Sequence, residues 1–193
     1  MMALVMEAPK PRQSELDRAM LERCKRGDPL AFRALVVRYE KPVFALLSRM
    51  IGHGPQVEDL AQETFLRAYR AIGTFDLDGS ARISTWLLTI ATRLALDARK
   101  KKTHETLEED PPPAIDPSTP ESERGRAELG RAIARAADSL PDDQRAAFVL
   151  AEFHDLGIGE IARVLDIPEN TAKTRLFRAR EKMRAALESW RES

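Results

Sequence analysis

The sequence predicts an all-α protein in which two helical domains are joined by a Pro-rich acidic linker, with a helix-turn-helix in the C-terminal domain. Apolar residues recur at steps of three and four along most of the chain, whereas the alternation typical of strands is nearly absent. Five prolines fall within residues 102–121, where a helix cannot continue. Near the C-terminus, the turn Asp166-Ile167-Pro168 separates two segments with helical periodicity.

The first domain is predicted at residues 14–102, after a disordered N-terminus at residues 1–13. Helix start and stop signals define its elements. A short helix over residues 14–26 ends at Gly27. The long helix that follows is capped by Asp28, has Pro29 in its first turn, should bend at Pro42 and ends at Gly52. A helix over residues 57–72, a turn-rich loop over residues 73–81 and a helix over residues 84–101 complete the domain.

The linker is predicted at residues 103–121, because a stretch so rich in proline and acidic residues can neither continue a helix nor form a core. The second domain follows at residues 122–193. Its first helices are predicted near residues 121–139 and 142–154, and the helix-turn-helix lies between Leu156 and Leu187.

The second helix of this motif, opened by Pro168 or Glu169, has two different faces. Its apolar residues recur at steps of three and four and must face the interior: Ala172, Leu176, Ala179, Met183, Leu187 and Trp190. The other side carries Lys173, Thr174, Arg175, Phe177, Arg178 and Arg180. A helix with one apolar and one basic face, held by a short preceding helix, fits the DNA major groove.

Plainer interpretations of this helix are a solvated basic helix in a bundle and an amphipathic helix at a membrane surface. The residues of the preceding turn favour DNA binding over both. Phe177 fits either a core position or a contact with a thymine methyl group. Arg180 and Arg184 fit simple solvation of the helix end, where cations complement the helix dipole.

The net charge is zero, but the charges are unevenly distributed. Residues 82–102 hold six Lys/Arg and one acid, residues 103–123 hold seven acids and no Lys/Arg, and residues 173–184 hold six Lys/Arg and one acid. Two basic blocks separated by an acidic one indicate nucleic-acid contacts at two places.

The sequence shows no apparatus for catalysis. It has no Gly-rich phosphate loop and no nucleophile elbow, and its histidines and its single Cys24 are scattered without metal-ligand spacing. A lone cysteine forms no internal disulfide, which indicates a reducing compartment, and no apolar run is long enough to cross a membrane. The sequence therefore predicts a cytoplasmic protein that is not an enzyme, holds no cofactor or metal and does not insert into membranes.

Three stretches resemble the extracytoplasmic-function group of sigma-70-type factors. Residues 59–65, Asp-Leu-Ala-Gln-Glu-Thr-Phe, resemble the helix that these factors dock on the polymerase clamp. Residues 84–97, which include Ser-Thr-Trp-Leu and Ile-Ala-Thr-Arg-Leu-Ala-Leu-Asp, resemble their helix for the −10 element. Residues 140–180 resemble their −35 domain, with the recognition helix at residues 170–180. The three stretches occur in the expected order.

The resemblance implies an alternative sigma factor that binds core RNA polymerase, recognises the −10 and −35 promoter elements and directs transcription initiation. It assigns sigma region 2 to residues 14–102 and sigma region 4 to residues 122–193. The implied core polymerase contacts are Asp59, Leu60, Gln62, Glu63 and Phe65; the −10 contacts are Ile83, Trp86, Arg93, Arg99, Lys100 and Lys101; the −35 contacts are Lys173, Thr174, Arg175, Phe177 and Arg178. An anti-sigma factor is a further implied partner.

Within these sets, some residues have a second interpretation. Asp59 and Glu63 also fit an ordinary solvated acidic face, and Trp86 also fits a packing residue. The loop at residues 76–83 is expected to hold a base flipped from the non-template strand, and the Lys/Arg residues after it to hold phosphates. Arg93 stands where many relatives carry Asn, so the −10 bases that it reads cannot be carried over from them.

The length of the linker agrees with this interpretation. Sigma factors of this type read two elements about 16–17 base pairs apart, or roughly 55–58 Å along B-DNA. The linker of 19 residues reaches at most about 63–68 Å when fully extended. It can therefore span the gap, and its acidity fits either the basic RNA path of polymerase or a generic linker.

Two rival functions are a stand-alone helix-turn-helix transcriptional regulator and a sigma mimic that sequesters an anti-sigma protein. The regulator explains the C-terminal half but leaves the first basic block and residues 59–65 without a role. A mimic need not keep Lys173, Arg175 and Arg178 on one face. The sigma factor explains all of these features.

Overall fold

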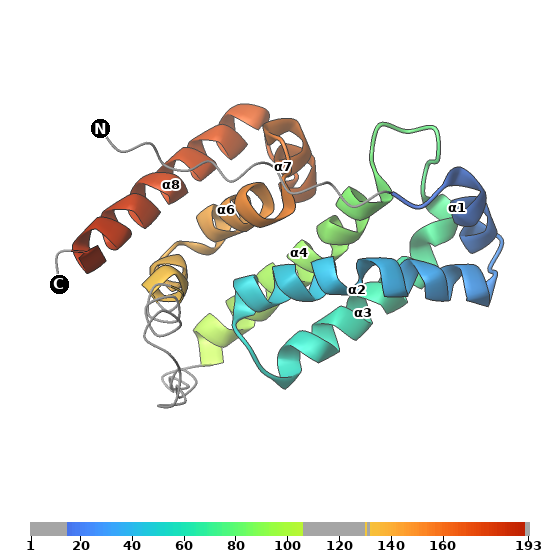
Figure 1. The fold of residues 1–193 in the computed structure, drawn as a ribbon, viewed down its shortest axis with the longest axis horizontal. Coiled ribbons are helices and arrows are strands. Elements are labelled where there is room, and N and C mark those ends of the chain that lie inside the picture. Colours follow the sequence, from blue (N-terminus) through green and yellow to red (C-terminus); the bar gives the residue numbers. More distant parts are fainter. Residues whose placement is uncertain (1–14, 106–129, 131, 192–193) are drawn as a thin grey trace.

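A computed structural model describes residues 15–105, 130 and 132–191 of the chain (Figure 1). The predicted N-terminus at residues 1–13 and most of the predicted linker lie outside these residues. The helices are α1 (Arg18–Lys25), α2 (Pro29–Ile51), α3 (Pro55–Ala71), the single 3-10 turn η1 (Ile72–Thr74), α4 (Ile83–Glu105), α6 (Asp142–His154), α7 (Ile158–Leu165) and α8 (Glu169–Arg191), and residues 132–138 are helical too. All regular structure in the described residues is helical, which confirms the predicted all-α class.

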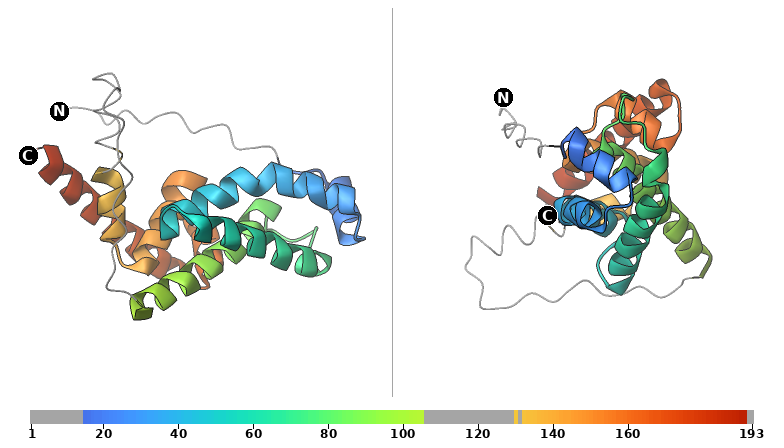
Figure 2. Two further views of the ribbon diagram at one scale, coloured as in Figure 1. Left: turned by 90° about the horizontal axis from the view of Figure 1, so that it is seen from below. Right: turned by 90° about the vertical axis from the view of Figure 1, so that its right-hand side faces the viewer.

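The long helix α2 begins and ends where its sequence signals are. The Asp28 carboxylate accepts hydrogen bonds from the backbone N–H groups of Leu30 and Ala31 at 2.9 and 3.2 Å. Gly52 ends the helix with a φ of 92°, a left-handed conformation that favours glycine. The helix runs through Pro42 without a break, and the left view of Figure 2 shows that it is arched, as expected where proline removes a backbone hydrogen bond.

The N-terminal bundle consists of α1 to α4. One of its cores lies where α1, α2, the end of α3 and the start of α4 meet, and includes Leu35, Tyr39, Phe75 and Leu87. Leu35, Tyr39 and Leu87 occupy the periodic apolar positions of their helices, and Phe75 follows η1, so burying them removes apolar surface from water.

The C-terminal bundle consists of residues 132–138 and helices α6, α7 and α8. Its own small core includes Ala136, Leu140, Ala179 and Met183. Helices α6 and α7 are each followed by an aspartate in the left-handed conformation, Asp155 with φ 52° and Asp166 with φ 54°. Short polar residues tolerate that conformation better than others, and both ends are tight enough to fold α7 back onto its neighbours.

The two bundles pack directly against each other. Helix α7 lies along α4 and α6 lies along α2, as Figures 1 and 2 show. The largest core of the described residues is continuous across this boundary: Leu47, Leu88 and Ala91 of the first bundle belong to it together with Val149 and Ile161 of the second. The sequence predicted two separate bundles, each with its own interior. In the structure, some of the apolar side chains assigned to those interiors pack against the other bundle.

An arginine is buried at this boundary. Arg145 of α6 is 1% exposed, and its guanidinium donates to the backbone carbonyls of Ala137 and Met50 at 2.9 Å and to the carboxylate of Asp138. Burial lowers the pKa of this guanidinium, but the acceptors around it compensate much of the cost of desolvation. Because Met50 is the penultimate residue of α2, Arg145 ties the second bundle to the first.

Candidate nucleic-acid interface

The turn between α7 and α8 sets the direction of the second helix. The backbone N–H groups of Asp166 and Ile167 donate to the carbonyls of Arg163 and Ala162 at 3.3 and 3.0 Å and so close the end of α7. The carbonyl of Pro168 then accepts the first hydrogen bonds of α8, from Thr171 and Ala172. The predicted helix-turn-helix is therefore confirmed, with the turn where the sequence placed it.

Helix α8 has the two faces that its sequence predicts. Ala172, Leu176, Ala179 and Met183 are buried against the rest of the domain. On the other side, Lys173, Thr174, Phe177 and Arg178 are exposed. Phe177 is 61% exposed, which excludes the core position that the sequence left open for it. An exposed phenylalanine flanked by cationic side chains suits an apolar contact with a base between phosphate contacts.

Arg175 differs from the rest of the predicted −35 set. Its side chain is half-buried, and its guanidinium pairs with the carboxylate of Asp143 on α6 at 3.0 Å. In this conformation it holds α8 against α6 and does not present a free guanidinium to DNA. Arg180 has a similar role, because it pairs with Glu152 of α6 at 2.6 Å.

Helix α4 carries the first basic block. Arg93, Lys100 and Lys101 are exposed, as phosphate contacts must be. Arg99 instead points into the boundary between the bundles, where it donates to the Met50 carbonyl at 2.8 Å and to the carboxylate of Asp142. The Met50 carbonyl therefore accepts from two arginines, Arg99 of α4 and Arg145 of α6.

The loop that precedes α4 is exposed, but the apolar residues beside it are not. Ile83 is 2% exposed and belongs to the core of the first bundle. Trp86 is half-buried, with its ring 5.4 Å from that of Phe75. Trp86 therefore packs in this conformation, the second interpretation that its sequence context allowed.

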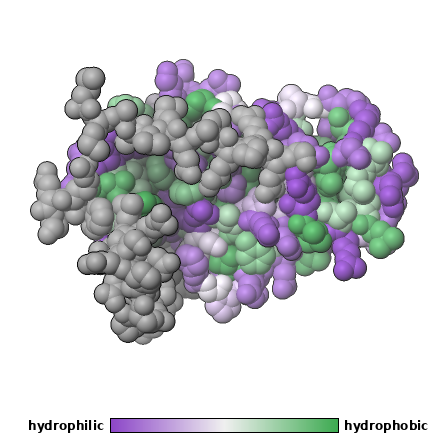
Figure 3. Space-filling model, in the orientation of Figure 1, coloured by the Kyte–Doolittle hydropathy of each residue, from purple (hydrophilic) through white to green (hydrophobic). Residues whose placement is uncertain are grey.

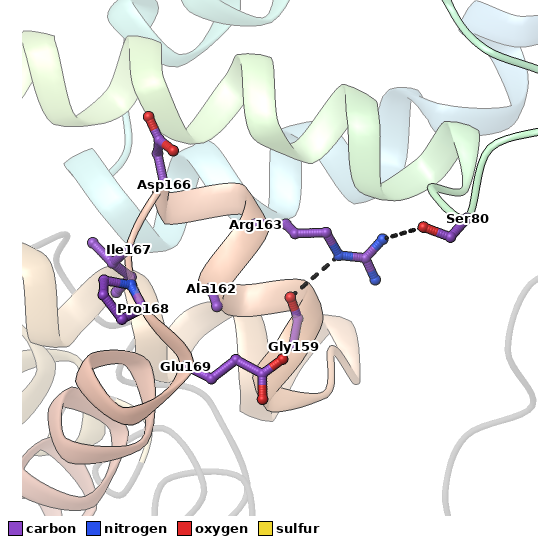
Figure 4. A pocket seen from close by; sticks show the side chains of 8 residues that line it. All are labelled: Ser80, Gly159, Ala162, Arg163, Asp166, Ile167, Pro168 and Glu169. Carbon is purple, nitrogen blue, oxygen red and sulfur yellow. Dashed lines mark hydrogen bonds between the residues drawn. The ribbon is translucent and has the colours of Figure 1, made fainter.

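The second bundle also contacts this loop. Arg163 of α7 donates to the hydroxyl of Ser80 at 3.2 Å and to the carbonyl of Gly159 at 3.3 Å, across the shallow hollow shown in Figure 4. Nearby, the hydroxyl of Thr85 donates to the carboxylate of Glu160 at 3.2 Å. In this arrangement α7 therefore lies next to the loop that is expected to hold a flipped base.

The predicted polymerase-binding residues of α3 separate into two groups. Asp59 and Gln62 are exposed, and Glu63 pairs with Arg67 at 2.6 Å. Leu60 and Phe65 are half-buried and pack against the cores. These two side chains pack α3 against the rest of the protein and leave little apolar surface for a partner.

The exposed apolar residues of α3 are ones that the sequence did not single out. Leu66 and Tyr69 are each 50% exposed and follow Asp59 and Gln62 at helical spacing. Figure 3 shows apolar side chains at the surface of this end of the molecule, where Leu30 of α2 is exposed as well. Helical spacing could have identified both residues, because steps of three and four from Asp59 lead through Gln62 to Leu66 and Tyr69.

Comparison with known proteins identifies the family. Residues 35–105 match the family described as sigma-70 region 2, and residues 130–183 match sigma-70 region 4. The chain is 36% identical over 185 residues to the RNA polymerase sigma-H factor of Pseudomonas aeruginosa, covering 90% of this chain and 95% of that protein. The ECF RNA polymerase sigma-E factor of Escherichia coli is also 36% identical, over 182 residues that cover 86% of this chain and 91% of that protein. The chain belongs to the extracytoplasmic-function group of the sigma-70 family.

Solved structures show the same fold. CnrH in complex with the cytosolic domain of CnrY matches with a TM-score of 0.67 and 26% identity, over 90% of this chain and 97% of that one. The sigma factor RpoE of Bartonella quintana, in complex with the anti-sigma factor NepR, matches with a TM-score of 0.64 and 18% identity, over 81% and 96%.

This protein is therefore an alternative sigma factor, a subunit that gives RNA polymerase its promoter specificity. A stand-alone helix-turn-helix regulator would not account for the region 2 match in the N-terminal bundle. The family consists of transcription initiation factors and not of enzymes. Among the helices that the structure describes, none is long and apolar enough to cross a membrane.

Proposed function

We propose that the exposed face of α3 binds core RNA polymerase, that α4 and its preceding loop act at the −10 element, and that α8 reads the −35 element. The proposed domains are region 2 at residues 14–102, the linker at residues 103–121 and region 4 at residues 122–193. The observation that carries the proposal is the pair of basic helical surfaces, α4 and α8, within the two matched regions. The proposed setting is the cytoplasm, where core polymerase acts.

At the −35 element, α8 enters the major groove with Lys173, Thr174, Phe177 and Arg178. These side chains share one exposed face near the start of the helix, which is the end that recognition helices present to bases. Arg175 joins them only if its ion pair with Asp143 opens.

At the −10 element, Arg93, Lys100 and Lys101 hold phosphates while the loop at residues 76–83 accepts an extruded base. Extruding a base costs a few kcal/mol, which stacking and hydrogen bonds in a preformed pocket must offset. Phosphate contacts position the DNA without reading its sequence.

While the two bundles are packed against each other, the sigma factor cannot read the −10 and −35 elements at the same time. Helix α7 packs against both α4 and α8, so the axes of α4 and α8 are separated by at most two interaxial distances of packed helices, about 16–20 Å. Sigma factors of this type read elements roughly 55–58 Å apart on B-DNA. Binding to polymerase and promoter must therefore separate the bundles, which breaks the contacts of Arg99 and Arg145 with Met50.

An anti-sigma factor is a proposed further partner. It is supported by the resemblance to the group and by the relatives solved in complex with other proteins, one of which is named an anti-sigma factor. Such a partner would act by stabilising the closed arrangement of the two bundles.

Run-off transcription with core polymerase on a genomic promoter library tests the proposal. We expect start sites downstream of a shared pair of sequence elements, and none with core polymerase alone. Leu66→Ser should weaken core binding, whereas Phe177→Ser should leave core binding unchanged and reduce initiation at promoters that depend on the −35 element. Each variant is the control for the other, because both remove an exposed apolar side chain. Failure of the wild-type chain to bind core polymerase would contradict the proposal.

A further inference from the structure

The loop that precedes α4 is attached to α1 at its start and in its middle, and the first turn of α4 is attached to Glu15, which lies before α1. At the start, the Lys25 ammonium donates to the carbonyl of Phe75 at 2.6 Å. In the middle, both terminal nitrogens of Arg18 donate to the carboxylate of Asp78, at 2.6 and 3.4 Å. Just after the loop, the hydroxyl of Ser84 in the first turn of α4 donates to the carboxylate of Glu15, which precedes the N-cap residue Asp17 of α1.

The loop has little structure of its own to hold its shape. Residues 76–82 contain no helix or strand and are mostly exposed. The Asp76 carboxylate accepts a hydrogen bond from the backbone N–H of Asp78 at 2.9 Å, a local turn that a short polar side chain makes. A loop with so few internal contacts takes its conformation from the groups that tie it down.

Glu15 is itself held by hydrogen bonding to a buried residue of the first bundle. Tyr39 of α2 is 3% exposed, and its hydroxyl donates to Glu15 at 2.8 Å and accepts from the backbone N–H of Leu16 at 3.3 Å. Burial, with the neighbouring Glu15 carboxylate second, raises the pKa of this tyrosine, so it stays protonated and remains a donor. The Tyr39 side chain thus holds Glu15 in place from the core of the first bundle.

The contact between α1 and the loop is also electrostatic. The hydrogen bond from Arg18 holds the pKa of the Asp78 carboxyl below its usual value, so this pair is fully charged at neutral pH. Both side chains are more than half exposed, so the pair contributes little to global stability. Its effect is local, on the shape of the loop.

Helix α1 lies before the segment that matches sigma-70 region 2, which begins at residue 35. We propose that α1 braces the base-holding loop, and that Glu15, Arg18 and Lys25 are positioning residues for promoter opening. This inference rests on the proposed function of the loop. Arg18 and Lys25 contact the loop and its first flanking residue, and Glu15 contacts Ser84 at the start of α4. In this proposal they act on how often the loop adopts the shape that receives an extruded base.

The central test is a charge swap in the intact holoenzyme on a promoter identified by run-off transcription. Arg18→Glu replaces attraction by repulsion, and Asp78→Arg in the same chain restores an ion pair of opposite polarity. We expect Arg18→Glu to reduce open-complex formation roughly fivefold, measured by permanganate reactivity of unpaired thymines, and the double variant to recover most of it. Arg26→Glu, an exposed residue just after α1, is the matched control and should have no effect.

Two further readouts separate a positioning role from a general loss of structure. Core binding and the midpoint of thermal unfolding should be unchanged in Arg18→Glu, while amide hydrogen exchange at residues 76–82 should become faster. Recovery of slow exchange in the charge-swapped chain would support the brace. Unchanged promoter opening and unchanged loop exchange in Arg18→Glu would overturn it.

Replacement of residues 77–81 by a Gly/Ser sequence of equal length distinguishes the role of the loop in promoter opening from the role of α1 as its brace. If the loop replacement reduces opening and Arg18→Glu does not, the brace is wrong and the proposed function of the loop stands. If the loop replacement opens promoters as well as the wild type, both the loop's function and the brace are wrong.

Discussion

The two basic surfaces of this sigma factor differ in how ready they are to meet DNA. On α8, Lys173, Thr174, Phe177 and Arg178 are exposed in the closed fold. On α4, Arg99 is bonded to α2 and α6, and the loop before α4 is tied to α7 through Ser80 and Arg163. Similar helices thus differ because of what they pack against: α8 exposes its basic side, whereas α4 is partly covered by the second bundle.

Separation of the two bundles should therefore matter more for α4 than for α8. The proposed −35 surface is already exposed and needs no rearrangement to touch a major groove, while the proposed −10 surface is expected to need separation of the bundles. The C-terminal end of α2 is the centre of the contact, because the Met50 carbonyl accepts from Arg99 and Arg145. The end of a helix carries partial negative charge, which strengthens its attraction for both guanidinium groups. We therefore expect variants at this point to affect the two surfaces unequally.

The largest expected effect is that of Arg145→Ala. The substitution removes a buried side chain and its hydrogen bonds to Ala137, Met50 and Asp138 and leaves a cavity at the boundary. The free energy of unfolding should fall by about 2–4 kcal/mol, measured by denaturant titration. Amide exchange should rise along α4 and α7 more than along the outer face of α3.

Arg135→Ala is the matched control, because Arg135 is an exposed arginine in the same bundle. We expect its effect on unfolding to be below about 0.5 kcal/mol. Equal stability of the Arg145→Ala and Arg135→Ala chains would show that the buried guanidinium does not hold the bundles together.

A smaller effect is expected from Arg178→Ala on the exposed surface. If Arg178 contacts a base, −35 binding by the holoenzyme should weaken by about 1–3 kcal/mol, and discrimination at one position of the element should relax. Fluorescence anisotropy on a set of single-base variants of the element measures both. Arg184→Ala, which alters an exposed arginine six residues further along α8, is the control.

A uniform loss on all of these sequences would instead mark Arg178 as a phosphate contact. In that case the slope of binding against salt concentration should fall by about one charge. No loss on any sequence would remove Arg178 from the −35 surface.

The smallest expected effect is a pH dependence of stability due to His154 of α6. Burial, together with the nearby charge of Arg49, lowers the pKa of His154 to about 4, and its Nε2 atom is buried without a hydrogen-bond partner among the described residues. The folded protein therefore keeps His154 neutral, while the unfolded chain takes up a proton below its ordinary pKa of about 6.5. Stability should be full above that value and be lost as the pH falls, by about 1 kcal/mol between pH 7.5 and pH 5.5.

Urea titrations of the wild type and of His154→Phe at both pH values measure this. The phenylalanine should make the difference between the two pH values smaller by about that amount. The same pH dependence in both proteins would assign it to other groups. Arg49 itself stacks its guanidinium 4.1 Å from the ring of Phe153, so α2 and α6 stay in contact at this point in either case.

Local signals predicted most of the secondary structure. Asp28, Pro29 and Gly52 defined α2 to within a residue, and the turn at residues 166–168 correctly predicted where α7 ends and α8 begins. The apolar stripe of α8 correctly predicted the burial of Ala172, Leu176, Ala179 and Met183, whereas Arg175, predicted on the opposite face, is half-buried. These features depend on backbone geometry and helical periodicity, which the sequence carries within a few residues.

Local sequence signals could not predict the contacts between the two bundles. The periodicity of α7 shows that Ile161 and Ala162 are buried, but not that Leu88 and Ala91 of α4 help to bury them. Arg99 looked like a phosphate contact because it lies in a run of cations, and only the tertiary structure shows it at the Met50 carbonyl. Long-range pairing is set by packing, so a single sequence does not reveal it.

The distance between the bundles in the free and the promoter-bound protein shows whether they separate when the sigma factor acts. Dyes on Arg70→Cys in α3 and Lys182→Cys in α8 would report it by fluorescence energy transfer; both positions are exposed, whereas the native Cys24 is buried. Free protein should give one short distance, and holoenzyme on promoter DNA a distance longer by tens of ångströms, in line with the roughly 55–58 Å between the elements. An unchanged distance in a complex that initiates transcription would contradict the account.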